Sequence, residues 1–158
     1  MITVAEARWP MSTTDSIPAL AGFVESTFSP LAAEVARRCL AGVRPDPQTA
    51  VIIVSSSGDL ATARATAHAV DHGKRLGPLL FFQAVPNAVA GYLAAKWDLR
   101  GPVVCLSPAQ PGLAEGLAVA DLVIRDGDAT HALIISVEQA KAEGEHDTAR
   151  AVLVKGAV

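Results

Sequence analysis

Short apolar runs alternate with amphipathic stretches along the chain, and this alternation predicts the fold class. Four runs rich in β-branched residues are candidate strands, at residues 51–54, 103–106, 132–135 and 151–154. The first three are apolar at every position, a pattern typical of parallel strands that are buried on both faces. Ile2-Thr3-Val4 predicts one more, short strand at the start of the chain.

Between these runs, apolar residues recur at helical spacing. Ser29-Pro30 is a good helix start, Asp59 is a suitable N-cap, and Pro86 suits a first helical turn. The acidic stretch at residues 143–147 predicts an exposed turn that makes the last two strands antiparallel. The expected helices cover residues 29–42, 59–73, 86–97 and 112–124.

The order of these elements predicts an α/β fold with helices on both faces of a sheet. A length of 158 residues suits one domain, so we expect a single domain over residues 1–158. With 51% hydrophobic residues the chain can build a sizeable core, which excludes a disordered protein. The net charge of −3 gives no basic excess to neutralise phosphates, so nucleic acid is not expected as a partner.

The sequence also bears on location and redox state. No apolar run reaches the roughly 18–20 residues of a membrane helix, so we expect no membrane partner. The first ten residues lack a basic region followed by an apolar stretch, so no secretory signal is expected and the predicted location is cytoplasmic. Cys39 and Cys105 both lie in apolar segments, which favours two buried thiols over a disulfide.

Candidate chemistry in the side chains is sparse. His68 and His72 are four residues apart, but no third ligand has suitable spacing, which favours a solvated helix face over a metal site. The Ser55–Asp59 loop is placed to hold an anion with its N–H groups, yet it lacks the lysine and the glycine spacing of a phosphate-binding loop. Burial in mid-strand would hide a nucleophilic Cys105. The residues alone therefore nominate no catalytic site, no metal and no cofactor.

Residues 78–138 carry several motifs in a fixed order. Phe81 and Phe82 precede V-P-N-A-V-A-G at 85–91, L-R-G-P follows at 99–102, and I-R-D-G-D-A at 124–129 leads into a strand. This series resembles the N-terminal half of the β-ketoacyl synthases, condensing enzymes with a thiolase fold. The resemblance extends weakly to the strand and the Ser-Ser-Ser-Gly of residues 51–58.

The resemblance implies half a thiolase fold, with a mixed five-stranded sheet in the order 3-2-1-4-5. The third strand is then an edge strand, and an apolar edge is an aggregation hazard unless another chain covers it. In condensing enzymes this strand pairs with its equivalent across the dimer axis. The implied dimer-interface residues are Val85, Pro86, Asn87, Val103, Val104, Cys105, Leu106 and Ser107.

Gln110 stands where the family has its nucleophilic cysteine, within Ser107–Gly112. A carboxamide cannot form the thioester that covalent condensation requires. Glutamine at this position is the mark of chain length factors, which are non-acylating partners of ketosynthases, and of decarboxylating priming domains. The paired histidines of the family belong to its C-terminal half, and none of the four histidines here lies in such a motif. The resemblance therefore implies a pseudoenzyme without catalytic residues.

The expected function is that of a chain-length-factor-like subunit that pairs with a full-length ketosynthase. The resemblance places it in type II polyketide, aryl-polyene or fatty acyl biosynthesis, with an acyl carrier protein as a transient partner. Three alternatives remain: a malonyl-carrier-protein decarboxylase that acts as a priming factor, a degenerate half-fold without a partner, and an unrelated α/β binding protein. The residues implied to shape the partner's acyl tunnel are Leu60, Ala63, Ala67, Phe81 and Phe82.

Overall fold

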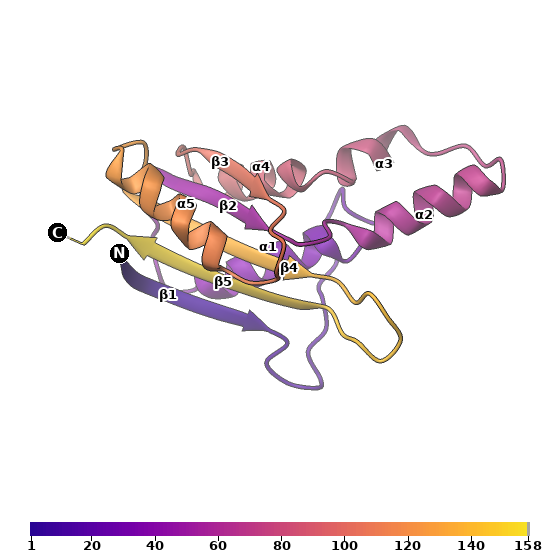
Figure 1. Cartoon of the computed structure of the whole chain (residues 1–158), viewed down its shortest axis with the longest axis horizontal. Coiled ribbons are helices and arrows are strands. Elements are labelled where there is room, and N and C mark those ends of the chain that lie inside the picture. The colour runs from indigo at the N-terminus through magenta and orange to yellow at the C-terminus, as the bar shows by residue number, and fades with distance from the viewer. Residues whose placement is uncertain (158) are drawn as a thin grey trace.

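The computed structural model describes residues 1–157. Their fold is built around one five-stranded mixed sheet (Figure 1). The strand order is β1-β5-β4-β2-β3. β2 runs parallel to both β3 and β4, whereas β5 is antiparallel to β4 and to β1. The strands are β1 Ile2–Trp9, β2 Thr49–Val54, β3 Val103–Leu106, β4 His131–Glu138 and β5 Thr148–Lys155.

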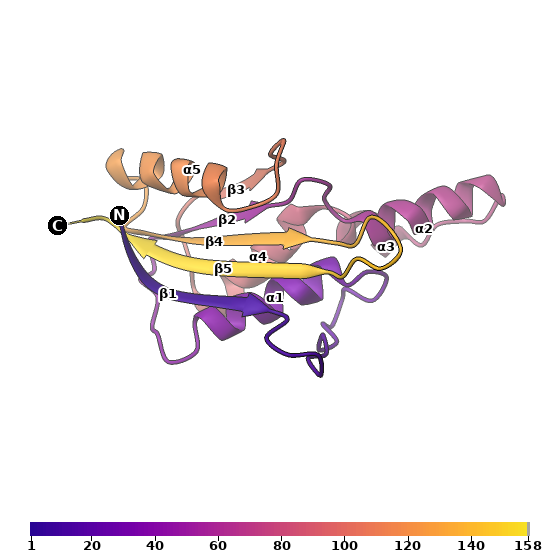
Figure 2. The same cartoon turned by 60° about the horizontal axis from the view of Figure 1, so that its bottom comes forward.

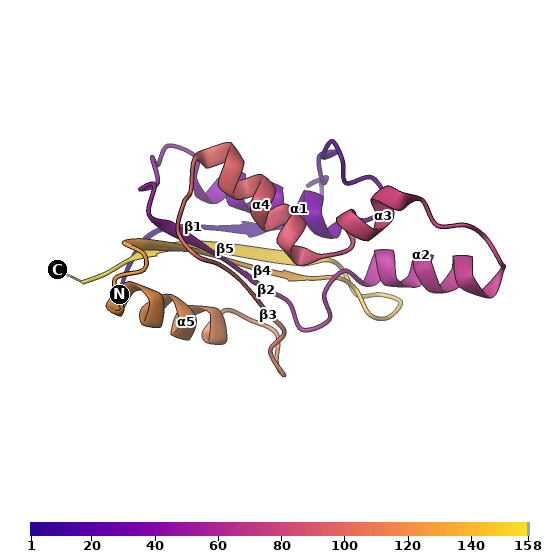
Figure 3. The same ribbon diagram turned by 90° about the horizontal axis from the view of Figure 1, so that it is seen from above.

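Helices cover both faces of this sheet. α1 (Phe28–Cys39) and α4 (Pro86–Trp97) lie on one face, and α5 (Ala114–Arg125) lies on the other (Figures 2 and 3). α2 (Leu60–Asp71) and α3 (Pro78–Gln83) project beyond the end of the sheet and form an arm, residues 60–83 (Figure 3). None of the helices in residues 1–157 has both the length and the apolar character needed to cross a bilayer.

The core lies on both faces of β2 and β4, two adjacent parallel strands in the interior of the sheet. Every residue of β2 is buried, and its alternate side chains serve opposite layers because successive side chains of a strand point to opposite faces. Val51 and Ile53 join the cluster under α1 and α4, while Ile52 and Val54 join the cluster under α5. Gly116 lets α5 approach the sheet closely, since a Cβ there would lie 2.6 Å from Ile134 Cγ2.

Several expectations from the sequence are confirmed. The sheet is mixed, has five strands and carries helices on both faces, and β3 lies at its edge. β4 and β5 are antiparallel and the 143–147 segment lies between them. Asp59 caps α2, because its Oδ1 accepts a hydrogen bond from the Thr62 N–H at 3.0 Å.

The position of β1 differs from its place in the expected order 3-2-1-4-5. There the first strand stands between the second and the fourth, but in the structure β2 and β4 pair directly and β1 lies at the far edge beside β5. β1 carries Glu6 and Arg8 on one of its faces, and Glu6 accepts hydrogen bonds from Arg8 and Arg150. A strand with charged side chains on one face fits an edge, whereas β2 and β4 are apolar enough to be covered on both faces.

The two edges of the sheet are unlike. β1 has a bulge between Thr3 and Ala5 and carries charged side chains, two features with which natural sheets avoid pairing at an edge. β3 has neither feature, and its side chains are alternately exposed and half-buried, with Val103 43% exposed. The β3 edge is therefore the side of the sheet on which a further strand can add.

Candidate functional site

The main-chain polar groups of β3 divide between the sheet and the solvent. The Val51 N–H donates to the carbonyl of Pro102 at 2.9 Å, and the Ser55 N–H donates to the carbonyl of Leu106 at 3.0 Å. Because successive residues of a strand point their polar groups to opposite sides, Val104 also turns its N–H and C=O toward β2. Val103 and Cys105 consequently present their N–H and C=O outward, free to bond a strand of another chain.

Cys105 links this edge to α4. Its Sγ donates a hydrogen bond to Asn87 Oδ1 at 2.9 Å, and desolvation raises the pKa of the thiol. The expectation of two buried thiols is confirmed for Cys39, which is 2% exposed, and is wrong for Cys105, which is exposed. The apolar run that contains Cys105 resembles a buried strand, but its place at the sheet edge leaves the side chain uncovered.

A crevice opens where the chain leaves β2 and β3. The connection after β2 leads to α4 on one face, and the connection after β3 leads to α5 on the other, the arrangement at which open α/β sheets form ligand sites. The crevice has a volume of about 280 Å³. Most of its polar lining is hydroxyl groups, and the Ser57 Oγ is buried without a partner among residues 1–157. The residues that line it are Ile53, Ser55, Ser56, Ser57, Gly58, Pro86, Cys105, Leu106 and Ser107.

In the Ser55–Asp59 loop, the donors of Ser56 and Gly58 are already bonded to other groups of the protein. The Ser56 N–H and Oγ–H donate to the two carboxylate oxygens of Glu138 at 2.7 and 2.6 Å, and Lys141 Nζ donates to the Ser56 Oγ at 3.0 Å. The Gly58 N–H donates to the Ser55 Oγ at 3.0 Å. With these donors occupied and the Glu138 carboxylate beside Ser56, the loop links the ends of β2 and β4 and is not arranged to bind an anion.

Gln110 lies outside the crevice lining. It is exposed in the loop between β3 and α5, between Pro108 and Pro111, and α5 begins only at Ala114. The expected helix start at residue 112 thus lies two residues before the observed one. Gln110 is therefore held neither at the helix N-terminus nor against an acid or base, and the position has no features of an activated nucleophile.

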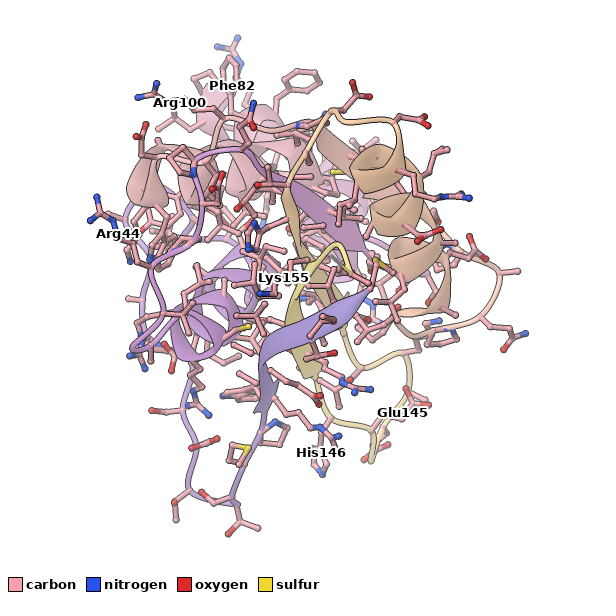
Figure 4. All side chains as sticks on the ribbon, turned by 90° about the vertical axis from the view of Figure 1, so that its left-hand side faces the viewer. Arg44, Phe82, Arg100, Glu145, His146 and Lys155 are labelled. Atoms are coloured by element: carbon pink, nitrogen blue, oxygen red, sulfur yellow. The ribbon has the colours of Figure 1, made fainter. Side chains whose placement is uncertain are left out.

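The arm carries the remaining predicted residues. On α2, Leu60 is half-buried while Ala63 and Ala67 are exposed. On α3, Phe81 and Phe82 are 75% and 66% exposed, with ring centroids 6.0 Å apart in an edge-to-face arrangement. In Figure 4, Phe82 lies at the rim of the molecule, at the opposite end of the view from Glu145 and His146 in the β4–β5 turn.

α3 is an element that the sequence reasoning missed, although Pro78 at its first turn was an available signal. It runs through Val85, which is 42% exposed, into Pro86 and Asn87 of α4. Because Asn87 bonds Cys105, the apolar surface of α3 and the β3 edge are joined by one short segment. The structure thus brings the predicted interface residues together, and it places the α3 aromatics next to them along the chain.

The histidines form no metal centre in the part of the chain that the structure describes. The His68 and His72 rings lie side by side on exposed α2, with centroids 4.1 Å apart, and His72 Nδ1 contacts the carbonyl of His68. Residues 1–157 hold no group of three or more His, Cys, Asp or Glu side chains that is arranged to bind a metal ion. His131 lies in β4 and His146 in the β4–β5 turn, on other elements.

Comparison with known proteins gives one family and a set of similar folds. The model of the family described as "Beta-ketoacyl synthase, N-terminal domain" matches residues 4–150. A search of curated proteins finds no match. Among solved structures, a ketosynthase (ApeO) in complex with its chain length factor (ApeC) from Xenorhabdus doucetiae matches with a TM-score of 0.78 and 16% identity. That match covers 99% of this chain and 79% of the other.

Two further structures extend the comparison. The ishigamide ketosynthase/chain length factor matches with a TM-score of 0.74 and 20% identity, over 92% of this chain and 49% of that one. A type II polyketide synthase acyl-carrier protein in complex with its ketosynthase matches with a TM-score of 0.59 and 16% identity, over 82% and 47%. The chain spans about half the length of these last two proteins, and at such identities the likeness is one of fold.

Proposed function

Because the chain belongs to the β-ketoacyl synthase family and matches its N-terminal domain, we propose that it is a chain-length-factor-like subunit. In this proposal it acts as a single domain that pairs with a full-length ketosynthase in type II polyketide, aryl-polyene or fatty acyl biosynthesis. The ketosynthase supplies the nucleophile, and this chain supplies part of the surface that bounds the acyl tunnel.

The observation that carries the proposal is the open β3 edge. Val103 and Cys105 present unpaired main-chain groups beside an apolar surface, and a strand from another chain would satisfy both. Two of the similar structures are described as ketosynthases with chain length factors, which supports a ketosynthase as the partner. The proposed interface residues are Val85, Pro86, Asn87, Val103, Val104, Cys105, Leu106 and Ser107.

A non-acylating role fits the surroundings of Gln110. The exposed carboxamide lies in a loop before α5, and the hydroxyl-lined crevice nearby offers no base within its lining. Acyl transfer through a covalent enzyme intermediate requires an activated nucleophile, which this arrangement does not supply. The acyl chain would therefore stay on the ketosynthase or on an acyl carrier protein. The similar carrier-protein complex supports the carrier as a transient partner.

The arm is the proposed tunnel-shaping element. Ala63 and Ala67 are exposed on one face of α2 and leave room beside them, and Phe81 and Phe82 offer large exposed rings on α3. Exposed aromatic rings at the rim of a protein mark a surface that another molecule covers. In this proposal these four residues, together with Leu60, close the far end of the partner's tunnel.

The direct test is co-expression with the ketosynthase encoded in the same gene cluster, with an affinity tag on one chain only. We expect both chains to elute together at one-to-one stoichiometry, with a mass measured by light scattering. A monomer that does not associate with the ketosynthase would contradict the proposal. Release of carbon dioxide from malonyl carrier protein by the isolated chain would favour the decarboxylase instead.

A further inference from the structure

α2 projects from the body of the protein with almost no core of its own. Of its residues Leu60–Asp71, only Thr62 is buried (Figures 1 and 3). A helix of 12 residues is marginal in water on its own, and packing normally decides where it points. Full burial is confined to the first turn, so the contacts that can fix the direction of α2 lie at its N-terminal end, which we call the root of the arm.

Gln139 occupies the centre of this root and uses both ends of its amide. The side chain is 5% exposed and follows the last residue of β4. Its Oε1 accepts a hydrogen bond from the Ala61 N–H in the first turn of α2 at 3.1 Å. Its Nε2 donates to Thr27 Oγ1 at 2.8 Å and to Ser26 Oγ at 3.3 Å, at the start of α1. A single side chain therefore ties the N-termini of α1 and α2 to the end of β4.

The residues next to Gln139 complete the root. Ser26 Oγ donates to Asp59 Oδ1 at 2.5 Å, so the cap of α2 is itself bonded to the segment before α1. Asp147 accepts from Thr27 Oγ1 at 2.7 Å and from the Ala140 N–H at 2.9 Å, which holds the β4–β5 turn against the same segment. Arg64, one turn along α2, donates to the carbonyl of Lys141 at 3.0 Å. The root is thus polar, and its hydrogen bonds have directions that a hydrophobic contact would lack.

We propose that Gln139 is a positioning residue that fixes the direction of the arm before any partner binds. The identity of the partner that the arm contacts is taken from the proposed function, and in this respect the inference rests on it. An interface surface that is already arranged loses less conformational freedom on binding, and it meets the partner in one geometry. Gln139 itself lies on the β4–β5 side of the root and is absent from the proposed interface, so it acts on the partner through α2.

The first experiment uses the isolated chain and needs no partner. In Gln139→Leu the Ala61 N–H loses its acceptor, and the Ser26 and Thr27 hydroxyls each lose one of their hydrogen bonds. We expect amide hydrogens of α2 to exchange roughly 30- to 150-fold faster, the effect of losing two or three net hydrogen bonds of about 1 kcal/mol each. Exchange in β2 and β4 should stay as in the wild type. The control Gln48→Leu removes an exposed glutamine before β2 and should leave α2 unchanged. Equal acceleration across all elements, or none in α2, would overturn the proposal.

A second variant covers the case in which Gln139→Leu does not fold. Gln139→Glu keeps an acceptor for the Ala61 N–H but loses both donors and places a carboxylate near Asp59 and Asp147. At neutral pH we expect amide hydrogens of α2 to exchange faster in this variant than in the wild type. Compared at equal pH, this difference should shrink as pH falls and the introduced carboxylate gains a proton, because a protonated carboxyl can donate again. Exchange in α2 at the wild-type rate in Gln139→Glu at neutral pH would count against the proposal.

The final measurement is binding to the ketosynthase of the same gene cluster. We expect Gln139→Leu to bind about tenfold more weakly than Gln48→Leu, and acyl products of the complex to spread over more chain lengths. Wild-type affinity in a variant whose α2 exchanges faster would refute a role for arm direction. Failure of the wild-type chain to bind would instead contradict the proposed function, while the exchange results on the isolated chain would still decide what holds α2.

Discussion

Val104 and Cys105 are neighbours in β3, yet their main-chain N–H groups face opposite ways. The N–H of Val104 points to β2, and that of Cys105 points out of the sheet. Proline lacks this donor, so substitutions at the two positions test different things. One position reports on the fold of the single chain, and the other reports on pairing with another chain.

For Cys105→Pro we expect a folded chain that no longer forms the complex with the ketosynthase. Edge strands accept proline where the N–H faces solvent, so the unfolding temperature should change little. Val104→Pro removes a donor to β2 and should cost about 1–3 kcal/mol of unfolding free energy in the chain alone. Cys105→Val keeps the N–H and should still assemble. Size-exclusion chromatography of each variant with the ketosynthase, beside thermal unfolding, separates these effects; an intact complex with Cys105→Pro would rule out edge pairing.

Replacing Gln110 by cysteine should not create a working site. The new thiol would be exposed in the loop before α5, without a base or a helix N-terminus to lower its pKa, so it should titrate near the ordinary value of about 8.5. We expect no acyl adduct on Gln110→Cys by intact-protein mass spectrometry after incubation with acyl carrier protein. Gln110→Ala should leave condensation by the ketosynthase largely intact. Acyl loading of the new cysteine followed by turnover would contradict the expectation that this position cannot support a working nucleophile.

Larger side chains on α2 should shorten the products of the complex. Ala63 and Ala67 are exposed, so Ala63→Trp and Ala67→Phe add volume without disturbing the core of the single chain. If α2 bounds the acyl tunnel, the reconstituted complex should assemble normally and release shorter acyl chains. Ala118→Phe and Ala118→Trp, on the exposed face of α5, are controls that match the two variants in added volume. Unchanged product lengths from an intact Ala63→Trp complex would place the end of the tunnel elsewhere.

A methyl group at position 116 should destabilise the fold. The added Cβ of Gly116→Ala would lie 2.6 Å from Ile134 Cγ2 and 2.7 Å from Val54 Cγ2, so α5 must move away from the sheet. We expect a loss of about 1–3 kcal/mol in unfolding free energy. Gly91→Ala in α4 has open space around it and should instead stabilise the helix by about 0.5–1 kcal/mol. Urea unfolding of the two variants measures both; equal effects would mean that α5 is not in close contact with the sheet.

Stability should depend on pH through Glu34. This carboxylate is 5% exposed, and hydrogen bonds from Arg37 and Arg38 hold its pKa below the ordinary value of 4.5. A lowered pKa in the folded state adds stability above about pH 4.5, and that stability disappears as pH falls through the folded-state pKa. At pH 7 we expect Glu34→Gln to be less stable by about 1–3 kcal/mol. Urea unfolding from pH 7 to pH 3 should show the difference shrinking; a constant difference would mean that the ionised carboxylate contributes nothing.

The elements that the sequence predicted well are those whose own residues determine them. β2 is apolar at every position but Thr49, β4 has an apolar run at residues 132–135, and α2 begins at a side chain that caps it, so local patterns suffice. β1 extends to Trp9 although only residues 2–4 were expected, because Glu6 and Arg8 interrupt its apolar character. Its place beside β5 depends on which strands pair, and pairing is not encoded in the pattern of one strand.

The interface at β3 is a prediction from the resemblance, and for Cys105 the residue pattern alone was misleading. β3 reads as a strand that is covered on both sides, so Cys105 was expected to be buried. The mismatch between an apolar strand and an open edge appears only in the structure. The root of the arm could not be foreseen at all, because Gln139 lies 78 residues from Ala61 in sequence and only tertiary folding brings them together.

The unlike edges of the sheet also limit how large an assembly can become. A sheet whose two edge strands can both pair with further strands can add one chain after another and grow into a filament. Here the bulge and the charges of β1 disfavour pairing at one edge, so each chain has a single edge suited to pairing, at β3. When a strand of another chain pairs with β3, the edge that this chain still exposes is β1, which does not favour the addition of a further strand. The architecture favours a closed pair over a polymer.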